Sequence, residues 1–322
     1  GTDTGNSIRG PSSHLALVGI RSTLGLTSRD GVIPLSFDRD VAGPMARTVE
    51  DAARLFNVVV GVDPADPYTE DGRGRAHADY TAFLDRDGLA GARLGVVRQL
   101  VDPAETDTAV ARLFEAALDD LESRGAILVD PLRLEGLFDR LSGGLFCRRF
   151  RYDMHVYLES LGEGAPIHDV ADVLETGQYS PYVEDRLRRF AELPADVHPR
   201  DWDPPCPDFF DHAGRMAFRD FVVGAMDAAG VDALVYPTWT APPAHLDRAV
   251  EEYRGDNSQI LAPAAGLPAI TVPMGFTYGS LPAGLQLLAR PYREDVLFRL
   301  AFAYEQATHH RRPPERFPPL RP

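Results

Sequence analysis

Apolar side chains recur with a helical period in several segments of the chain. From Thr106 to Arg124 they occupy every third or fourth position, and a glycine ends the helix that this pattern predicts. A second helix is predicted from Thr48 to Val60, because Thr48 and the acidic Asp51 three residues later resemble a capping box. The same period predicts two further helices, over 213–229 and 295–306.

Short apolar runs between these helices predict strands. They cover 92–97, 126–129, 231–236, 269–273 and 284–289. Strands that alternate with helices build mostly parallel or mixed sheets, with helices packed on the sheet faces. The pattern therefore predicts an α/β fold.

The regular pattern loosens between Leu132 and Pro207. This stretch contains helical pieces, aromatic residues and Pro-rich turns, without a repeat or a low-complexity tract. We interpret residues 132–207 as a variable helical insertion or cap within one domain that spans residues 1–322.

The charge and hydropathy of the chain argue against nucleic acids and membranes as binding partners. The chain has a formal net charge of −15, and all of its 33 basic residues are arginines, so no lysine occurs anywhere. A surface with this excess of carboxylates repels a phosphate backbone, which argues against direct nucleic-acid binding. The longest apolar stretches, such as Phe56–Val62, are far shorter than the ~20 residues of a membrane-spanning helix, so no membrane association is predicted.

The two cysteines and nine histidines do not follow a metal-binding pattern. Cys147 and Cys206 lie far apart without a CxxC or Cys/His spacing, which argues against a disulfide framework and against a zinc site. His309 and His310 are interpreted as a solvated helix end, and no metal is predicted. This cysteine usage leads us to expect a reducing, cytoplasmic location.

A candidate nucleophile lies in the opening run GTDTGNSIRGP. A serine that attacks an amide needs an exposed hydroxyl on a tight turn, beside backbone N–H groups that face the developing oxyanion. Ser7 meets this description if Gly5 lets the backbone bend and Asn6 tolerates a positive φ. Taken alone, the same residues favour an ordinary turn, in which Ser7 has no catalytic role.

Four ordered segments change this balance. They are GTDTGNSIRGP at 1–11, DVAGPMARTVEDA at 40–52, DALVYPT at 232–238, and AGLPAITVPMG with LPAGLQLLARP between 265 and 291. Together they resemble the amidase signature family over most of the chain. The resemblance implies a mixed β-sheet flanked by helices on both faces, in a chain expected to lack the N-terminal portion of the family.

The resemblance also implies a site. The family uses a Ser, cis-Ser, Lys triad without histidine, metal or cofactor, in which lysine is the final base. On the matching positions Ser7 is the nucleophile, and Asp3 and Arg9 brace its loop. The oxyanion hole is assigned to the backbone N–H groups of Thr4, Gly5, Asn6 and Ser7. A solvated surface pair is the alternative interpretation of Asp3 and Arg9.

Two members of that triad are absent from this chain. The family places its cis-serine in a Gly-Ser-Ser-Gly-Gly run before the nucleophile loop and its lysine earlier still, whereas Ser142-Gly143-Gly144 matches poorly and lies after Ser7. Arginine stays protonated and cannot act as the base. The chain as given is therefore predicted to be catalytically incomplete. It also has Asn6 where the family usually has glycine, and Arg21-Ser22-Thr23 where the family usually has Lys-Pro-Thr.

Other site residues are less constrained. His14 is the histidine closest to Ser7 in sequence, but no GxSxG elbow accompanies it, and a position on the helix after the loop explains it. Tyr236, Thr238 and Trp239 are candidate substrate-binding residues, because the matching segment borders the cleft in the family. Core packing is the alternative for such apolar and aromatic positions.

Three functions follow. The first is hydrolysis of a small-molecule carboxylic amide, or an ester, through an acyl-enzyme on Ser7, with release of ammonia or an amine. The second is the catalytic subunit of a tRNA-dependent amidotransferase, which needs partner subunits. The third is a non-catalytic fragment or pseudoenzyme. A homodimer is one assembly that the sequence allows.

Overall fold

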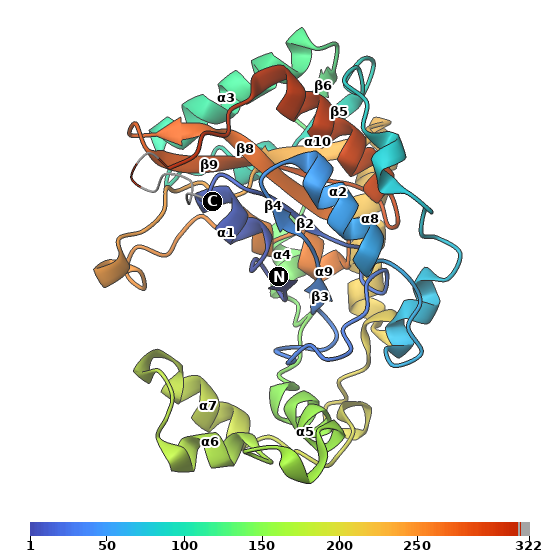
Figure 1. Cartoon of the computed structure of the whole chain (residues 1–322), viewed down its shortest axis with the longest axis vertical. Coiled ribbons are helices and arrows are strands. Elements are labelled where there is room, and N and C mark those ends of the chain that lie inside the picture. Colours follow the sequence, from blue (N-terminus) through green and yellow to red (C-terminus); the bar gives the residue numbers. More distant parts are fainter. Residues whose placement is uncertain (315, 317–322) are drawn as a thin grey trace, which may run out of the picture.

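The computed structural model describes residues 1–314 and 316 and centres on one mixed sheet (Figure 1). Seven strands lie in the order β4-β2-β8-β9-β7-β5-β6. Their bounds are β2 Val18–Arg21, β4 Met45–Ala46, β5 Arg93–Val96, β6 Ile127–Val129, β7 Ala233–Pro237, β8 Ala269–Thr277 and β9 Leu281–Leu288. β5 runs parallel to both β6 and β7, whereas β8 and β9 pair in antiparallel fashion. A separate antiparallel pair joins β1, Thr2–Asp3, to β3, Val41–Ala42.

Two apolar cores cover the two faces of the sheet. Helices α2 (Val49–Val59), α3 (Thr108–Ser123) and α10 (Glu294–Thr308) contribute to the first core, and α8 (Ala213–Ala229) and α9 (Ala262–Ala265) contribute to the second. In β7, Val235 lies in the first core and its neighbours Leu234 and Tyr236 lie in the second, which is the period-2 alternation of a strand. The α/β class with helices on both faces is confirmed.

The elements with strong periodicity form where the sequence predicts them. The four predicted long helices correspond to α2, α3, α8 and α10, and the five predicted strands correspond to β5 to β9. Thr48 caps α2, since its Oγ1 accepts from the Asp51 N–H at 3.0 Å. A short helix α1, Arg9–His14, follows the nucleophile loop.

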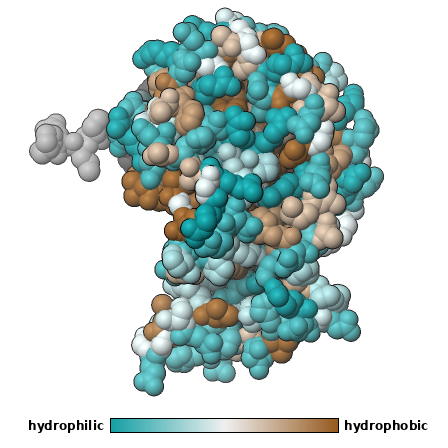
Figure 2. Space-filling view, turned by 90° about the vertical axis from the view of Figure 1, so that its right-hand side faces the viewer, coloured by the Kyte–Doolittle hydropathy of each residue, from teal (hydrophilic) through white to brown (hydrophobic). Residues whose placement is uncertain are grey.

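Helices α5 (Phe150–Ser160), α6 (Val170–Thr176) and α7 (Glu184–Ala191) form a small lobe away from the sheet (Figure 1). Its own apolar cluster contains Met154, Leu158 and Val170. Figure 2 shows this lobe joined to the larger body by a narrower neck, with mostly hydrophilic residues on the visible face. Helix α4, Leu137–Ser142, instead packs its Leu137 into the second core of the body. The treatment of 132–207 as an insertion stays a prediction.

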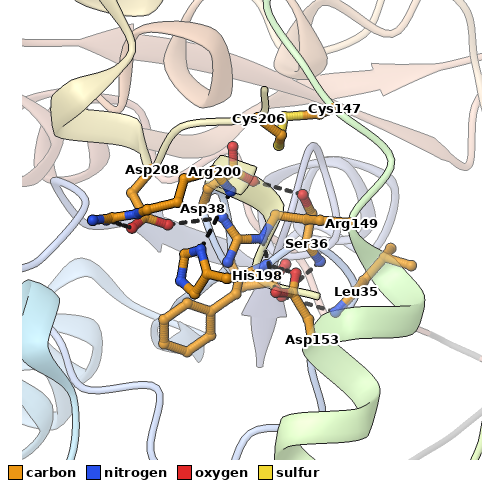
Figure 3. Close-up of polar contacts among 12 residues, drawn as sticks. Leu35, Ser36, Asp38, Cys147, Arg149, Asp153, His198, Arg200, Cys206 and Asp208 are labelled. Atoms are coloured by element: carbon orange, nitrogen blue, oxygen red, sulfur yellow. Dashed lines mark hydrogen bonds and ion pairs between the residues drawn. A yellow bond between two sulfur atoms is a disulfide. The ribbon is translucent and has the colours of Figure 1, made fainter. Parts of the chain in front are cut away.

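The expectation of unpaired cysteines is wrong. Cys147 and Cys206 form a disulfide with Cα atoms 5.9 Å apart (Figure 3). Cys147 precedes α5 and Cys206 follows α7, so the bond joins the two segments that lead into and out of the lobe, which form its neck. The two cysteines are 59 residues apart in sequence, and no spacing motif indicated that they pair. They meet because the lobe between them folds with its two ends close together. The argument for a reducing compartment therefore loses its basis.

Glu294, the first residue of α10, gives the fold a pH dependence. Its carboxylate is fully buried, accepts from the Thr23 N–H and Oγ1 at 2.7 Å each, and has an Oε2 without a hydrogen-bond partner among the described residues. Burial raises its pKa from 4.5 to about 7. The folded state thus binds this proton more tightly than the unfolded state does, so stability falls as the pH rises from about 4.5 through about 7.

We expect Glu294→Gln to weaken that fall. The neutral amide keeps an acceptor for Thr23 and has no charge to desolvate. Urea unfolding of both proteins at several pH values between 4.5 and 7.5 measures the difference, with Glu122→Gln on the exposed face of α3 as the control. The same pH profile for Glu294→Gln and the parent protein would show that Glu294 is not the group responsible.

Candidate active site

The loop that carries Ser7 connects β1 to α1. β1 is anchored by its pairing with β3, and Ile8 is the residue that precedes the first turn of α1. Ser7 is exposed, and its Oγ donates to the Asn6 side-chain oxygen at 3.3 Å. The structure therefore presents the predicted nucleophile at the surface, on a short turn between two fixed elements.

In this loop, backbone carbonyl groups accept hydrogen bonds, whereas the N–H groups of residues 4–7 have no partner among the described residues. Two carbonyl groups accept from arginines: Arg9 Nη2 donates to the Gly5 oxygen at 2.8 Å, and Arg21 Nη1 donates to the Asp3 oxygen at 2.6 Å. The Asn6 carbonyl oxygen accepts from the Gly10 N–H at 2.7 Å. The N–H groups of residues 4–7 donate no hydrogen bond within the described part of the chain. Such unpaired N–H groups beside a serine are available to an incoming anionic oxygen.

Asp3, Arg9 and Arg21 form a buried ionic cluster under the loop. All three side chains are fully buried, with Arg9 Nε 3.2 Å from Asp3 Oδ2 and Arg21 Nη1 3.0 Å from Asp3 Oδ1. Burial alone would raise the pKa of Asp3, but the charges of the two arginines outweigh it and hold that pKa below its usual value. A solvated surface pair is therefore excluded for Asp3 and Arg9.

The sequence identified Arg21 only as a departure from the family pattern. In the structure it is the second cation on Asp3, and it also donates to the Arg39 carbonyl oxygen at 2.7 Å. The apolar run at 15–20, directly before Arg21, was a signal that the sequence analysis did not use, because an arginine buried beside such a run needs an anionic partner.

Hydrogen bonds link Arg9 to Tyr236 of the second core through the side chain of Gln286. Its Nη1 donates to Gln286 Oε1 at 3.1 Å, and Gln286 Nε2 donates to the Tyr236 hydroxyl at 2.7 Å. Tyr236 is fully buried, and burial raises its pKa to about 12. The described structure thus places Tyr236 beneath the loop, with its hydroxyl oxygen accepting from a core glutamine.

Thr238 and Trp239 lie next to each other but in different surroundings. Thr238 is fully buried, and its hydroxyl group is hydrogen-bonded to that of Thr271. Trp239 keeps 8% of its surface exposed and covers α1 so closely that a Cβ on Gly10 would lie 3.0 Å from its ring. Of the three candidate substrate-binding residues, Trp239 is the one that retains exposed surface.

Asn6 is fixed by a polar cluster that the sequence did not predict. Its Nδ2 donates to Asp256 Oδ2 at 2.6 Å and to the Tyr253 hydroxyl at 3.0 Å, and Gln259 Nε2 also donates to Asp256 Oδ2 at 2.6 Å. Neither Asn6 nor Gly5 has a positive φ, so the expected left-handed turn is wrong. The side chain of Asn6, through its contact with Asp256 some 250 residues away, restrains the loop instead.

His14 has a hydrogen-bond partner other than Ser7. Its Nε2 lies 3.4 Å from the Ala241 carbonyl oxygen, and its ring centroid lies 4.7 Å from that of Trp239. Burial lowers the pKa of His14. As expected, it lies on the helix that follows the loop, where it is the last residue of α1.

Residues 1–314 and 316 contain neither a metal-binding cluster nor a membrane-spanning helix. No group of three or more His, Cys, Asp or Glu side chains there has an arrangement that could hold a metal ion. None of the helices in that part of the chain combines the length and the apolar composition needed to span a bilayer.

The chain matches one protein family over most of its length. A family model described as Amidase matches residues 1–298. The chain belongs to the amidase signature family. Amidase signature structures share its fold: native peptide amidase from Stenotrophomonas maltophilia aligns with a TM-score of 0.80 and 33% identity, over 98% of this chain and 63% of that chain.

Curated amidase signature relatives differ in function. One of them, a glutamyl-tRNA(Gln) amidotransferase subunit from Symbiobacterium thermophilum, is 32% identical over 96% of this chain and 63% of its own length. A probable amidase of Arabidopsis thaliana is 30% identical over 98% of this chain and 57% of its own length. The chain thus spans about three fifths of the length of these relatives.

Proposed function

We propose that this chain supplies the nucleophile and the oxyanion hole of an amidohydrolase that forms an acyl-enzyme on Ser7. One observation carries the proposal: Ser7 is exposed on a loop whose N–H groups at residues 4–7 have no partner among the described residues, while buried arginines hold the Asp3 and Gly5 carbonyl groups. This arrangement suits a carbonyl oxygen that gains negative charge.

The proposed reaction has two halves. Ser7 Oγ attacks the amide carbon while its proton passes to a base, and the tetrahedral oxyanion accepts from the N–H groups of the loop. Collapse of the intermediate breaks the C–N bond, and the leaving nitrogen takes up that proton and departs as ammonia or an amine. Water then attacks the acyl-enzyme, releases the carboxylic acid and returns the proton to Ser7. No cofactor enters either half.

The proposal places the base outside residues 1–322. This chain has no lysine, and arginine remains protonated. By analogy with the amidase signature triad, we assign the missing role to a cis-serine and a lysine that precede Gly1 in the natural protein. Asp3 and Arg9 are positioning residues in this proposal, because they hold the loop without reaching the substrate.

The base assignment gives a direct test. We expect the purified 322-residue chain to release ammonia from primary amides no faster than its Ser7→Ala variant. The natural protein, expressed with the residues that precede Gly1, is expected to hydrolyse the same amides. Ammonia release quantified with a coupled assay measures both. Turnover by the 322-residue chain that depends on Ser7 would contradict our account of the base, and a natural protein without activity would favour the pseudoenzyme hypothesis.

A second function is favoured by the similarity to the glutamyl-tRNA(Gln) amidotransferase relative. In that case the ammonia released from glutamine would pass to a partner chain. Glutaminase activity that appears only after co-purified partner chains are added would support the amidotransferase. Full activity of the natural protein alone on simple amides would support a free-standing amidase.

A further inference from the structure

A cavity with a volume of about 430 Å³ opens beside the nucleophile loop. Thr4 of that loop lines it, together with residues of the 35–39 segment and of the small lobe. Its volume falls within the usual range of small-molecule sites. The cavity therefore connects the proposed oxyanion loop to a lobe that the proposed chemistry does not use.

Arginines dominate the wall of this cavity, and no carboxylate lines it. The arginines are Arg39, Arg148, Arg149, Arg186 and Arg189. Arg149 is already neutralised by Asp153 and Asp208, at 2.7 and 2.8 Å, as the dashed lines in Figure 3 show. Arg189 Nε donates to the Asp185 backbone oxygen instead of a carboxylate. Among the described residues, the four arginines other than Arg149 form no ion pair with a carboxylate. In a chain with a net charge of −15, such a group indicates a site for an external anion.

Arg39 is the arginine of this cavity that lies next to the loop carrying Ser7. A Cβ on Gly5 would lie 3.6 Å from Arg39 Nη2, so the guanidinium contacts the nucleophile loop. Its Nε is buried without a hydrogen-bond partner among the described residues. Asp38 and Asp40 attract this charge, but neither forms an ion pair with Arg39. Asp38 pairs with Arg215 at 2.6 Å, and Asp40 accepts from the Leu35 and Ser36 N–H groups and from the Thr4 hydroxyl group.

Aromatic rings supply the apolar part of the same cavity. The Arg39 guanidinium carbon lies 3.8 Å from the centroid of the Phe146 ring, and the rings of Phe150 and Phe190 pack with centroids 4.8 Å apart. A ligand that combines an apolar or aromatic body with an anionic group fits this lining.

We propose that the cavity selects amide substrates that carry a carboxylate, which binds to Arg39 and to the arginines of α7. This inference rests on the proposed function, since it names the substrate class of the same site. Charge-assisted hydrogen bonds from a guanidinium to a carboxylate are strong and directional, so the charge of the substrate determines its affinity.

Binding of two matched amides to the 322-residue chain tests the inference without turnover. 4-Carbamoylbenzoate carries a carboxylate, whereas 4-methylbenzamide has a similar shape and no charge. By calorimetry at low salt we expect the anionic amide to bind at least ~10-fold more tightly, and the preference to shrink at 0.5 M salt as screening increases. Equal affinities for the two amides, or inorganic sulfate that binds as tightly as 4-carbamoylbenzoate, would overturn the inference.

Substitutions of single arginines test which residues cause the preference for the anionic amide. Arg39→Gln and the exposed Arg189→Gln are each expected to reduce the preference several-fold, and Arg39→Lys is expected to retain most of it. Arg188→Gln is the matched control, since Arg188 lies next to Arg189 on α7 but pairs with Glu184 at 2.6 Å. An unchanged preference in both glutamine variants would overturn the inference. If the natural protein hydrolysed both amides equally well, the carboxylate preference would be refuted and the proposed function would stand. If the natural protein kept the binding preference but had no activity, only the proposed function would be refuted.

Discussion

Replacing Ser7 by alanine in the natural protein is expected to lower kcat for amide hydrolysis by ~10⁴-fold or more. The substitution removes the only atom that can carry the acyl group in the proposed reaction, and the loop N–H groups alone stabilise no covalent intermediate. KM is expected to change much less, because the Ser7 side chain hydrogen-bonds only to Asn6 among the described residues. Steady-state kinetics on a primary amide separates the two parameters.

Ser142→Ala is the matched control for this experiment. Ser142 lies in the Ser-Gly-Gly run that resembles the cis-serine motif, but it is exposed at the end of α4 and donates to the Asp139 backbone oxygen. We expect this variant to keep the parent activity. A natural protein whose kcat survives Ser7→Ala would have its nucleophile elsewhere, and the Ser7 assignment would be wrong.

Asp3→Ala is expected to be the most destabilising of the loop substitutions, at about 3–5 kcal/mol in the free energy of unfolding. It leaves the guanidinium groups of Arg9 and Arg21 buried without their carboxylate. A buried charge that loses its partner keeps its desolvation penalty and gains nothing in return. Urea unfolding of the 322-residue chain at neutral pH measures the loss.

An exposed ion pair provides the contrast. Glu70 and Arg73 lie 2.6 Å apart, with more than half of each side chain accessible to solvent. We expect Glu70→Ala to cost less than about 1 kcal/mol, because water and salt screen such pairs. If Asp3→Ala cost no more than Glu70→Ala, the cluster under the loop would not be the structural support that we infer.

The regular elements could be predicted because their signals are local. The helix period of α3 and the cap at Thr48 depend on residues within a few turns of one another. Ser7, Asp3 and Arg9 lie within seven residues of one another, so a single motif contained them all. The ion pair between Asp3 and Arg9 has the short sequence separation that makes such an expectation possible.

The contacts that the sequence missed join distant parts of the chain. Asn6 contacts Asp256, and Cys147 pairs with Cys206 across the lobe. The arginines of the cavity come from the 39 segment, the neck and α7, and no period or spacing in the sequence relates them. Their proximity depends on how the lobe is attached, which the apolar pattern of 132–207 did not determine.

The disulfide at the neck has a consequence for how far the lobe of this chain can be altered. By joining Cys147 to Cys206, it turns the lobe into a covalent ring whose entry and exit points stay together whatever lies between them. Insertions or deletions inside the ring change its circumference without altering the two points of attachment, and loop-closure entropy depends only weakly on length. We therefore expect the lobe to accept changes of length and sequence that give the cavity new walls, while the sheet and the Ser7 loop remain as they are.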